Sequence, residues 1–210
     1  MFANTITTRL FLRVLCSADA PALFALTDSN RMDLEKWLPW VSATRSTNDS
    51  LRFIESSQEQ LKSRNGFQLG IWFETQLFGV IGIHQIDWEN LSTSVGYWLG
   101  CEYRGMGIMT TCCAVLLDHI FRGLNLNRVE IRCGSDNTKS RAIPERLGFR
   151  IDGTLREAEI IANKRNDLVV YSLLSAEWKS GRRSHLQSIA PYSNLISETS
   201  WDLRAKTISS

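Results

Sequence analysis

The sequence predicts a mixed α/β (α+β) fold with a mostly antiparallel central sheet. Three strand-forming runs, 67–74, 77–87 and 93–100, follow one another across short polar turns, which is typical of an antiparallel meander. A strand, a helix and a further strand then follow between Val95 and Cys133, and this order predicts one parallel pair with a right-handed crossover. With 210 residues, the chain has the usual size of one domain.

The segment before the meander is expected to contain an edge strand and three helices. Mixed apolar and basic residues over 9–15 favour the strand. A first helix is expected over 17–30, and a short second helix over 34–38 should stop at Pro39. Apolar spacing predicts a third helix over 51–65.

The helix predicted over 110–123 is amphipathic. Apolar residues recur from Met109 to Leu124 at intervals of three, four and one, which indicates a stripe that packs on the sheet. Cys112 and Cys113 lie within this stretch, so we expect buried thiols there rather than nucleophiles.

The sharpest functional signal is the turn before this helix, Arg104-Gly105-Met106-Gly107-Ile108-Met109. The first N–H groups of a helix lack intrahelical acceptors and carry the positive end of its dipole, so they can hold a phosphate that side chains do not block. Gly105 and Gly107 remove such side chains. Residue 110 is Thr, which excludes a dinucleotide fingerprint, and no Gly-Lys-Ser/Thr follows, which excludes a Walker loop.

The pattern Arg-x-x-Gly-x-Met at 104–109 resembles the Gcn5-related N-acetyltransferase (GNAT) superfamily, whose turn reads Gln/Arg-x-x-Gly-x-Gly/Ala. Met109 departs from the last position. NTKSRAIPERLGF at 137–149 is similar to the family's second cofactor segment, and WLPW at 37–40 to its ribosomal-protein (RimJ/RimL-type) branch. The resemblance covers roughly residues 5–178. It implies a splayed parallel strand pair, helices on both faces of the sheet, and acetyl-CoA as cosubstrate.

By this resemblance, the diphosphate of acetyl-CoA lies on 104–109, and its thioester lies along the strand at Trp98 and Leu99. A backbone N–H of 96–99 would donate to the thioester oxygen. Gly96 in this strand marks a bulge or a backbone that another group approaches closely. Asn137 is expected to bind pantetheine through its amide, or else only to cap a helix over 137–146.

Glu159 is the candidate base by resemblance to the ribosomal-protein branch. It lies in a loop expected over 156–167, between strands 149–155 and 168–174. A base is useful because an α-amine with a pKa of about 8 is mostly protonated at neutral pH. The alternatives are that Glu159 is merely solvated, or that a water relay removes the proton.

Many superfamily members protonate the leaving thiolate with a tyrosine, but Pro144 occupies that position here. Ser140 matches the serine proposed for this role in the ribosomal-protein branch, and alternatively only supports its helix. Trp37 and Trp40 are expected to line the acceptor side, or else to pack in a helical core. His84 is expected to be a packed strand residue rather than a base.

Composition bounds the partners and the location. The 24 basic and 22 acidic residues give a net charge of +2, without the strongly basic footprint of a dedicated nucleic-acid binder. The five cysteines form no Cys-x-x-Cys pair and the three histidines are scattered, so we expect free thiols and no metal site. No apolar run approaches the roughly 18 residues of a membrane span, and a cytoplasmic protein without membrane contact is expected.

These observations predict an acetyl-CoA-dependent N-acetyltransferase domain over 1–178 and a polar, basic, mostly unstructured tail over 179–210. The acceptor expected from the resemblance is a protein N-terminal amine, such as that of a ribosomal protein, which attacks the bound acetyl-CoA directly. A small amine (polyamine, amino acid or antibiotic) stays open as the acceptor, as does a CoA-sensing module without transfer activity. A homodimer is expected by resemblance alone.

Overall fold

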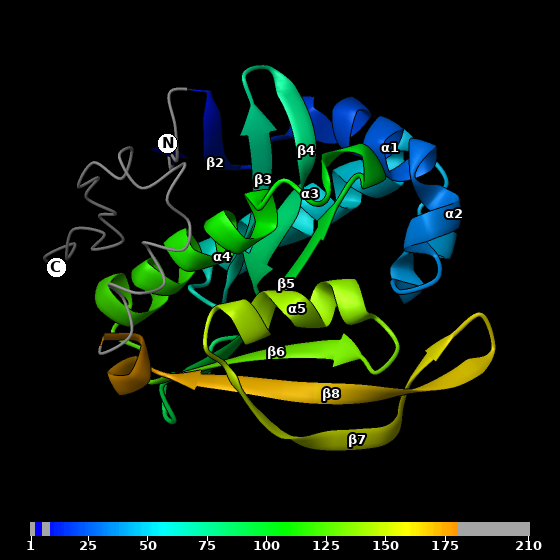
Figure 1. The fold of residues 1–210 in the computed structure, drawn as a ribbon. Coiled ribbons are helices and arrows are strands. Elements are labelled where there is room, and N and C mark those ends of the chain that lie inside the picture. The colour runs from blue at the N-terminus through cyan, green and yellow to red at the C-terminus, as the bar shows by residue number, and fades with distance from the viewer. Residues whose placement is uncertain (1–2, 6–8, 180–210) are drawn as a thin grey trace, which may run out of the picture.

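The computed structural model describes residues 3–5 and 9–179, and its strands form one eight-stranded sheet in the order β1-β2-β3-β4-β5-β6-β8-β7 (Figure 1). The strands are β1 (Ala3–Thr5), β2 (Leu10–Val14), β3 (Phe67–Phe73), β4 (Gln76–Ile83), β5 (Ser92–Leu99), β6 (Arg128–Gly134), β7 (Arg150–Ile161) and β8 (Lys164–Leu174). The helices are α1 (Ala20–Ser29), α2 (Arg31–Leu34), α3 (Thr47–Lys62), α4 (Ile108–Asp118) and α5 (Thr138–Arg146). Short helical segments are η1 (Ser17–Asp19), η2 (Pro39–Ala43), η3 (Cys101–Tyr103) and the π-helical η4 (His119–Gly123). The predicted tail lies, from residue 180 onward, outside the described residues.

The predicted fold class is confirmed. Strands β1 to β5 pair antiparallel in sequence order, β5 and β6 pair in parallel, and β6, β8 and β7 pair antiparallel. The parallel pairing joins only Ser92–Ser94 to Arg128–Glu130. Beyond it, β5 stays paired to β4 up to Leu99 and β6 stays paired to β8 up to Gly134, so the two strands diverge. This divergence is the splay that the resemblance implied.

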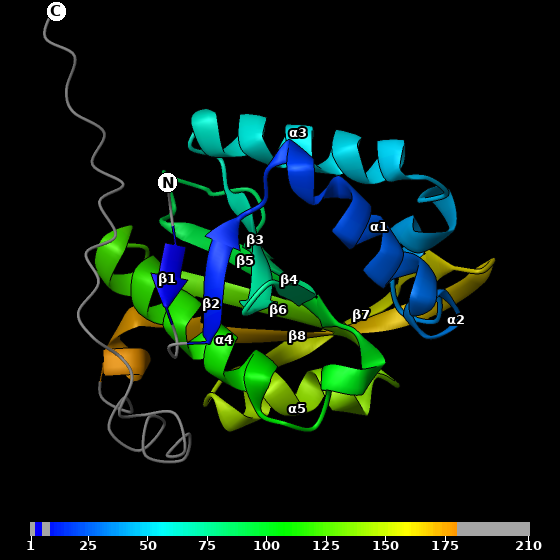
Figure 2. The same ribbon diagram turned by 90° about the horizontal axis from the view of Figure 1, so that it is seen from above.

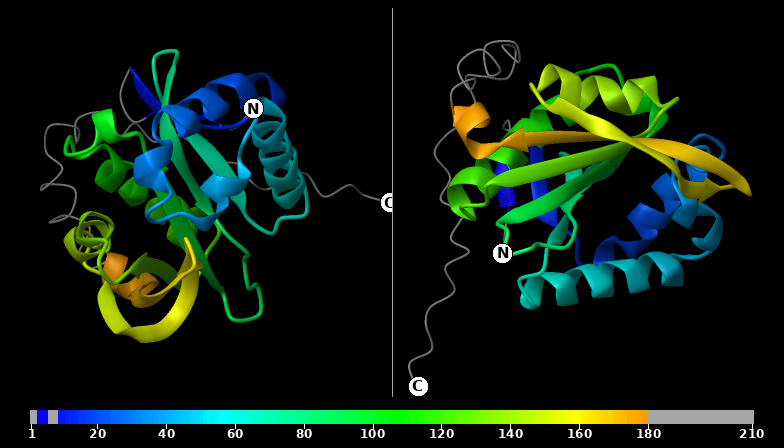
Figure 3. Two further views of the ribbon diagram at one scale, coloured as in Figure 1. Left: turned by 90° about the vertical axis from the view of Figure 1, so that its right-hand side faces the viewer. Right: turned by 90° about the horizontal axis from the view of Figure 1, so that it is seen from below.

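Helices cover both faces of the sheet. Helices α1 and α3 lie on one face and α4 and α5 on the other (Figures 2 and 3). Strand β4 is buried on both sides, because Val80 packs with the α1 and α3 cluster while Ile81 packs with the α4 cluster. A strand covered on both faces reads as a nearly continuous apolar run, as LFGVIGI does here. Among the described helices, none is both long and apolar enough to cross a bilayer.

The N-terminal elements differ from expectation in two places. Strand β2 was expected at an edge, but β1 pairs outside it. Helix α2 ends at Leu34, whereas a helix up to Pro39 was expected. Helical geometry is disfavoured at the residue before a proline, and Leu38 accordingly has extended backbone angles (φ −127°, ψ 105°). Trp37 therefore lies in the turn after α2 rather than on a helix.

The prediction of a loop over 156–167 is wrong, because β7 runs to Ile161 and β8 begins at Lys164. Ala162 and Asn163 both have positive φ, which is the geometry of a two-residue hairpin turn. Strand β7 is almost entirely exposed, so charged residues occupy positions on both of its sides and hide the usual alternation. Glu159 therefore projects from a strand, next to a register shift between Leu155 and Glu159.

Candidate active site

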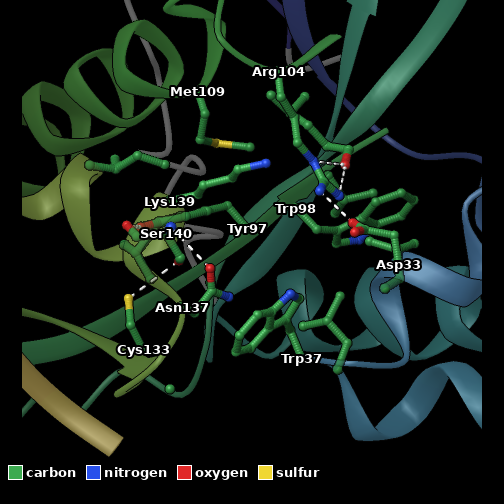
Figure 4. Close-up of a pocket in the computed structure, with 18 of the residues that line it drawn as sticks. Asp33, Trp37, Tyr97, Trp98, Arg104, Met109, Cys133, Asn137, Lys139 and Ser140 are labelled. Atoms are coloured by element: carbon green, nitrogen blue, oxygen red, sulfur yellow. Dashed lines mark hydrogen bonds and ion pairs between the residues drawn. The ribbon is translucent and has the colours of Figure 1, made fainter. Parts of the chain in front are cut away.

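A cleft of about 2040 Å³ opens where β5 and β6 diverge. On one side it is lined by the turn Arg104–Met109, which we call the phosphate turn, and by the start of α5. On the other side it is lined by Trp37, Trp40 and Trp98, which we call the aromatic side. Figure 4 labels Trp37 and Trp98. The site residues predicted from the sequence all line this cleft; they are Trp37, Trp40, Trp98, Leu99, Arg104, Gly105, Met106, Gly107, Ile108, Met109, Asn137, Ser140 and Glu159.

The phosphate turn leaves the start of α4 open. Gly105 and Gly107 have φ of +79° and +76°, a left-handed conformation that favours glycine. A Cβ added at either position would meet nothing within 4 Å, so the space in front of the turn is free of protein in the described structure. Gly107 is the N-cap of α4, and no described side chain caps this helix. The turn can therefore present bare N–H groups to an anion in the cleft.

The Arg104 side chain is already engaged. Its guanidinium donates to the Leu99 carbonyl oxygen from Nε at 3.2 Å and from Nη2 at 2.9 Å, and its Nη1 pairs with Asp33 Oδ2 (Figure 4). Met109 is 5% exposed, so the residue that departs from the family pattern lies in the core, whereas Met106 is 55% exposed at the tip of the turn. Arg104 can therefore fix the turn while the backbone faces the cleft.

The backbone of β5 offers polar groups to the cleft. Ser94 accepts a hydrogen bond from His84 N at 2.9 Å and Gly100 donates to Phe78 O at 2.9 Å, so both use the β4 side. Backbone direction alternates along a strand, so Tyr97 and Leu99 direct their N–H groups to the opposite side, toward β6. Since β6 pairs with β5 only as far as Ser94, these N–H groups face the gap between the strands.

The start of α5 forms a second wall of the cleft. Asn137 caps the helix, because its Oδ1 accepts from Ser140 N at 3.1 Å, and this leaves its amide nitrogen outside the cap. Ser140 Oγ lies 3.3 Å from Cys133 Sγ, and the Ser140 carbonyl accepts from the Tyr97 hydroxyl at 3.0 Å. The capping interpretation of Asn137 is thus correct without excluding a ligand contact by its NH₂ group.

Two cations of α5 were missed by the sequence reasoning. Lys139 and Arg146 line the cleft, and Arg146 Nη1 donates to Thr110 Oγ1 of α4 at 3.4 Å. Both can attract phosphate groups at the phosphate turn. The sequence did contain a signal for them. They are seven residues apart on a helix that begins next to Asn137, and this spacing places both on the same face of the helix.

Glu159 is half-buried, whereas the preceding residues of β7 are exposed. This burial raises the pKa of the Glu159 carboxyl, because a charged carboxylate is disfavoured where water is removed. On the aromatic side, the Trp40 and Trp98 rings lie 5.9 Å apart between centroids. Trp37 lies against Gly134 at the end of β6, since a Cβ there would come 3.7 Å from its ring. The cleft thus places the half-buried Glu159 carboxylate together with an aromatic wall.

Gly96 is not a bulge. Its pairing with Gly82 is regular, and the register shift in the meander lies between Ile71 and Trp72. The second interpretation is correct, because a Cβ at Gly96 would come 2.7 Å from the His84 ring. His84 lines the cleft and its Nδ1 lies 3.0 Å from Ser94 Oγ. His84 follows the end of β4 and its side chain is exposed to the cleft, so the expectation of a packed strand residue is wrong. Desolvation in the cleft, and then Arg132, lower the pKa of His84, which favours the neutral imidazole.

The thiols of α4 are buried and inert. Burial raises the pKa of both Cys112 and Cys113, which disfavours the nucleophilic thiolate. Within the part of the chain that the structure describes, all five cysteines are free, and no group of three or more His, Cys, Asp or Glu side chains could hold a metal ion.

Comparisons with known proteins agree with this geometry. A family profile described as "Acetyltransferase (GNAT) domain" matches residues 9–150. The chain is 36% identical over 181 residues to the "Putative ribosomal N-acetyltransferase YdaF" of Bacillus subtilis (strain 168), which covers 85% of this chain and 98% of the relative. The solved structure of the microcin C7 self-immunity acetyltransferase MccE with acetyl-CoA and AMP matches at a TM-score of 0.77 and 29% identity, over 80% of this chain and 94% of that one. RimL, the ribosomal L7/L12 alpha-N-protein acetyltransferase, in complex with coenzyme A, matches at a TM-score of 0.80 and 25% identity, over 82% and 98%.

Proposed function

The chain belongs to the GNAT acetyltransferase family, and from this premise we propose that it transfers the acetyl group of acetyl-CoA to the N-terminal amine of a protein. One observation carries the proposal. The uncapped start of α4, preceded by two glycines with positive φ, faces a cleft that continues between diverging β5 and β6. Such a cleft fits a diphosphate at one end and an extended thioester arm along the strand.

The residues of the cleft suit the binding of acetyl-CoA. The N–H groups of the phosphate turn would receive the diphosphate, with Lys139 and Arg146 beside it. The Asn137 amide nitrogen, free of the helix cap, would donate to the pantetheine arm. The N–H groups of Tyr97 and Leu99 are the candidates for the donor to the thioester oxygen, where charge develops as the amine attacks.

The proposed reaction is a direct transfer. The amine nitrogen bonds to the thioester carbon, the C–S bond breaks, and the amine loses one proton while the CoA thiolate gains one. Glu159, with a carboxylate on the cleft, is proposed to accept the proton from the amine. Ser140, whose Oγ lies beside Cys133, is proposed to donate the proton to the thiolate. Trp37 and Trp40 are proposed to orient the acceptor and to exclude water.

The choice of a protein N-terminus rests on two similarities. The names of YdaF and RimL refer to ribosomal N-acetyltransferase and to ribosomal L7/L12 alpha-N-acetylation. The MccE similarity favours a small-molecule amine as the second candidate, since that protein confers self-immunity to microcin C7. A module that binds CoA without transfer is the third. A domain over 1–178 with a polar tail, a cytoplasmic location and a homodimer complete the proposal.

An acceptor screen tests the proposal. Purified full-length protein and acetyl-CoA would be incubated with peptides that carry ribosomal-protein N-termini, with the same peptides blocked at the N-terminus, and with small amines. We expect CoA release and a mass gain of one acetyl group on the free N-terminus alone. Acetylation of small amines but not peptides would favour the second candidate. CoA binding in calorimetry without release from any acceptor would overturn catalysis.

A further inference from the structure

Arg104 and Asp33 are 71 positions apart in sequence and form an ion pair at the edge of the cleft (Figure 4). Arg104 opens the phosphate turn, and Asp33 lies on α2, which leads into Trp37 on the aromatic side. The same guanidinium donates twice to the Leu99 carbonyl at the end of β5. The Arg104 side chain thus joins the end of β5, the phosphate turn and α2.

A second contact joins the same segments. Asn30, which is 3% exposed between α1 and α2, accepts a hydrogen bond at its Oδ1 from Cys101 N at 2.7 Å. Asn30 Nδ2 is in turn fixed by the Leu26 carbonyl at 3.0 Å. The chain from Cys101 to Arg104 is therefore held at one end to the α1–α2 junction and at the other end to α2.

The charge of Asp33 opposes the use of Arg104 as a direct phosphate ligand. A carboxylate at the rim of an anion site repels the diphosphate, and it also occupies the guanidinium that would otherwise attract it. Its presence is understandable if the guanidinium holds the turn in shape while the backbone N–H groups hold the anion. Arg is suited to this because its planar fork can donate in two directions at once.

We propose that Asp33 is a positioning residue: through Arg104, it couples the aromatic side of the cleft to the binding of CoA by the phosphate turn. When α2 is in place, Arg104 fixes the turn in the shape that binds the diphosphate. By linkage, CoA on the turn then orders α2 and the following segment that carries Trp37 and Trp40. The inference rests on the proposed function only in requiring that CoA binds at this turn.

Calorimetry with CoA as the probe distinguishes the two possible roles of Arg104, because they predict opposite changes in CoA affinity for Asp33→Ala. If Asp33 positions Arg104, Asp33→Ala weakens CoA binding by about three- to tenfold, the range of a partly buried charge-assisted contact. If Arg104 is instead a direct ligand, Asp33→Ala removes a repelling charge, frees the guanidinium and tightens binding. Arg104→Lys keeps the cation but lacks the fork, so we expect the same weakening as in Asp33→Ala.

Glu35→Gln is the matched control. Glu35 follows α2 and pairs with Arg31 at 3.5 Å, but it does not line the cleft. Its change to Gln removes one negative charge, as Asp33→Ala does. Its CoA affinity should stay within about twofold of wild type. Asp33→Glu tests rescue, since a longer carboxylate can still reach a guanidinium. Thermal denaturation of each variant shows whether it is folded.

Hydrogen exchange provides a readout that a merely structural role would not change. In the wild type, CoA should slow amide exchange in 105–111 and also in 31–43. In Asp33→Ala at saturating CoA, the protection should remain in 105–111 and be lost in 31–43. Tighter or unchanged CoA binding by Asp33→Ala, or protection of 31–43 that survives the change, would overturn the inference. A wild type that binds no CoA would instead overturn the proposed function.

Discussion

Glu159 differs from the other acidic residues of β7 in its burial, and this difference gives a prediction at the scale of one residue. Burial raises its pKa, so as the pH falls the carboxylate takes up a proton earlier than a solvated glutamate does. A general base works only when deprotonated. The acid-side loss of kcat/KM in the wild type should therefore begin above the ordinary glutamate range.

Glu159→Gln should lower kcat/KM at neutral pH by about 10²-fold, the lower end for general base catalysis, with CoA affinity unchanged. The loss should shrink toward pH 9, where an α-amine with a pKa of about 8 is already deprotonated. Glu157→Gln is the control, because Glu157 is exposed on the same strand and pairs with Arg165 at 2.8 Å. If Glu159→Gln keeps the wild-type pH–rate profile, the proton goes to another group such as His84 or water.

Single residues of the site were predicted where their chemistry is local. The open turn at Gly105 and Gly107 and the helix cap at Asn137 depend on neighbours in sequence, and their local geometry is as expected, while their contacts with CoA stay a prediction. The Asp33–Arg104 pair was not predictable, because only the fold brings residues 71 positions apart together. Gly96 was predicted to be special, but only the structure shows that the group approaching it is His84.

At the scale of elements, a substitution in the phosphate turn should change folding stability and CoA affinity for two different reasons. Gly107→Ala should cost about 1 kcal/mol of folding free energy, because a non-glycine residue is strained at φ +76°. The added Cβ meets no protein atom within 4 Å, so it would stand in the space from which an anion approaches. We expect a loss of CoA affinity of at least about tenfold, the worth of one hydrogen bond to a charged group.

Gly153→Ala is the matched change for this experiment. Gly153 lies on β7, and a Cβ there also meets nothing within 4 Å, but its φ is not in the left-handed region. It should leave both the unfolding free energy and CoA affinity nearly unchanged. A Gly107→Ala protein that is less stable but binds CoA as the wild type does would show that the anion lies elsewhere.

The elements predicted best are those with strong periodicity. The meander and α4 follow from apolar patterns, which burial on one or both faces imposes. The hairpin over 156–167 was missed because β7 is solvated and its sequence carries charges at successive positions. Helix α2 was predicted over 34–38 but covers Arg31–Leu34, because Trp37 and Leu38 fit a helical spacing while Pro39 disfavours helical geometry at Leu38.

At the scale of the whole molecule, the divergence of β5 and β6 creates the site, yet no residue pattern predicted it. It came only from the resemblance to a family. In the structure, its physical basis is a parallel ladder of three residue pairs, after which each strand stays with its antiparallel neighbour. Local sequence reports which face of a strand is buried, and does not report where two strands separate.

His119 connects the stability of the whole molecule to pH. It begins η4, lies near the Phe67 ring of β3 and is 4% exposed, and burial lowers its pKa from 6.5 to about 4. A histidine that is harder to protonate in the folded state stabilises fully above pH 6.5, and this stabilisation is lost as the pH falls toward 4. At 1.36 kcal/mol per pKa unit, the loss amounts to about 3 kcal/mol.

Urea denaturation at a series of pH values from 7.5 to 4.5 should therefore show a falling free energy of unfolding in the wild type. The acidic residues with lowered pKa, such as Asp19 and Asp152, contribute mainly below this window, because their ordinary pKa is 3.8. His119→Phe keeps an aromatic ring near Phe67 but cannot be protonated, so its decline over this window should be smaller by about 2.5 kcal/mol. His119→Leu serves the same purpose should the ring not fit against Gly123. Equal declines in the wild type and both variants would assign the acid sensitivity to other groups.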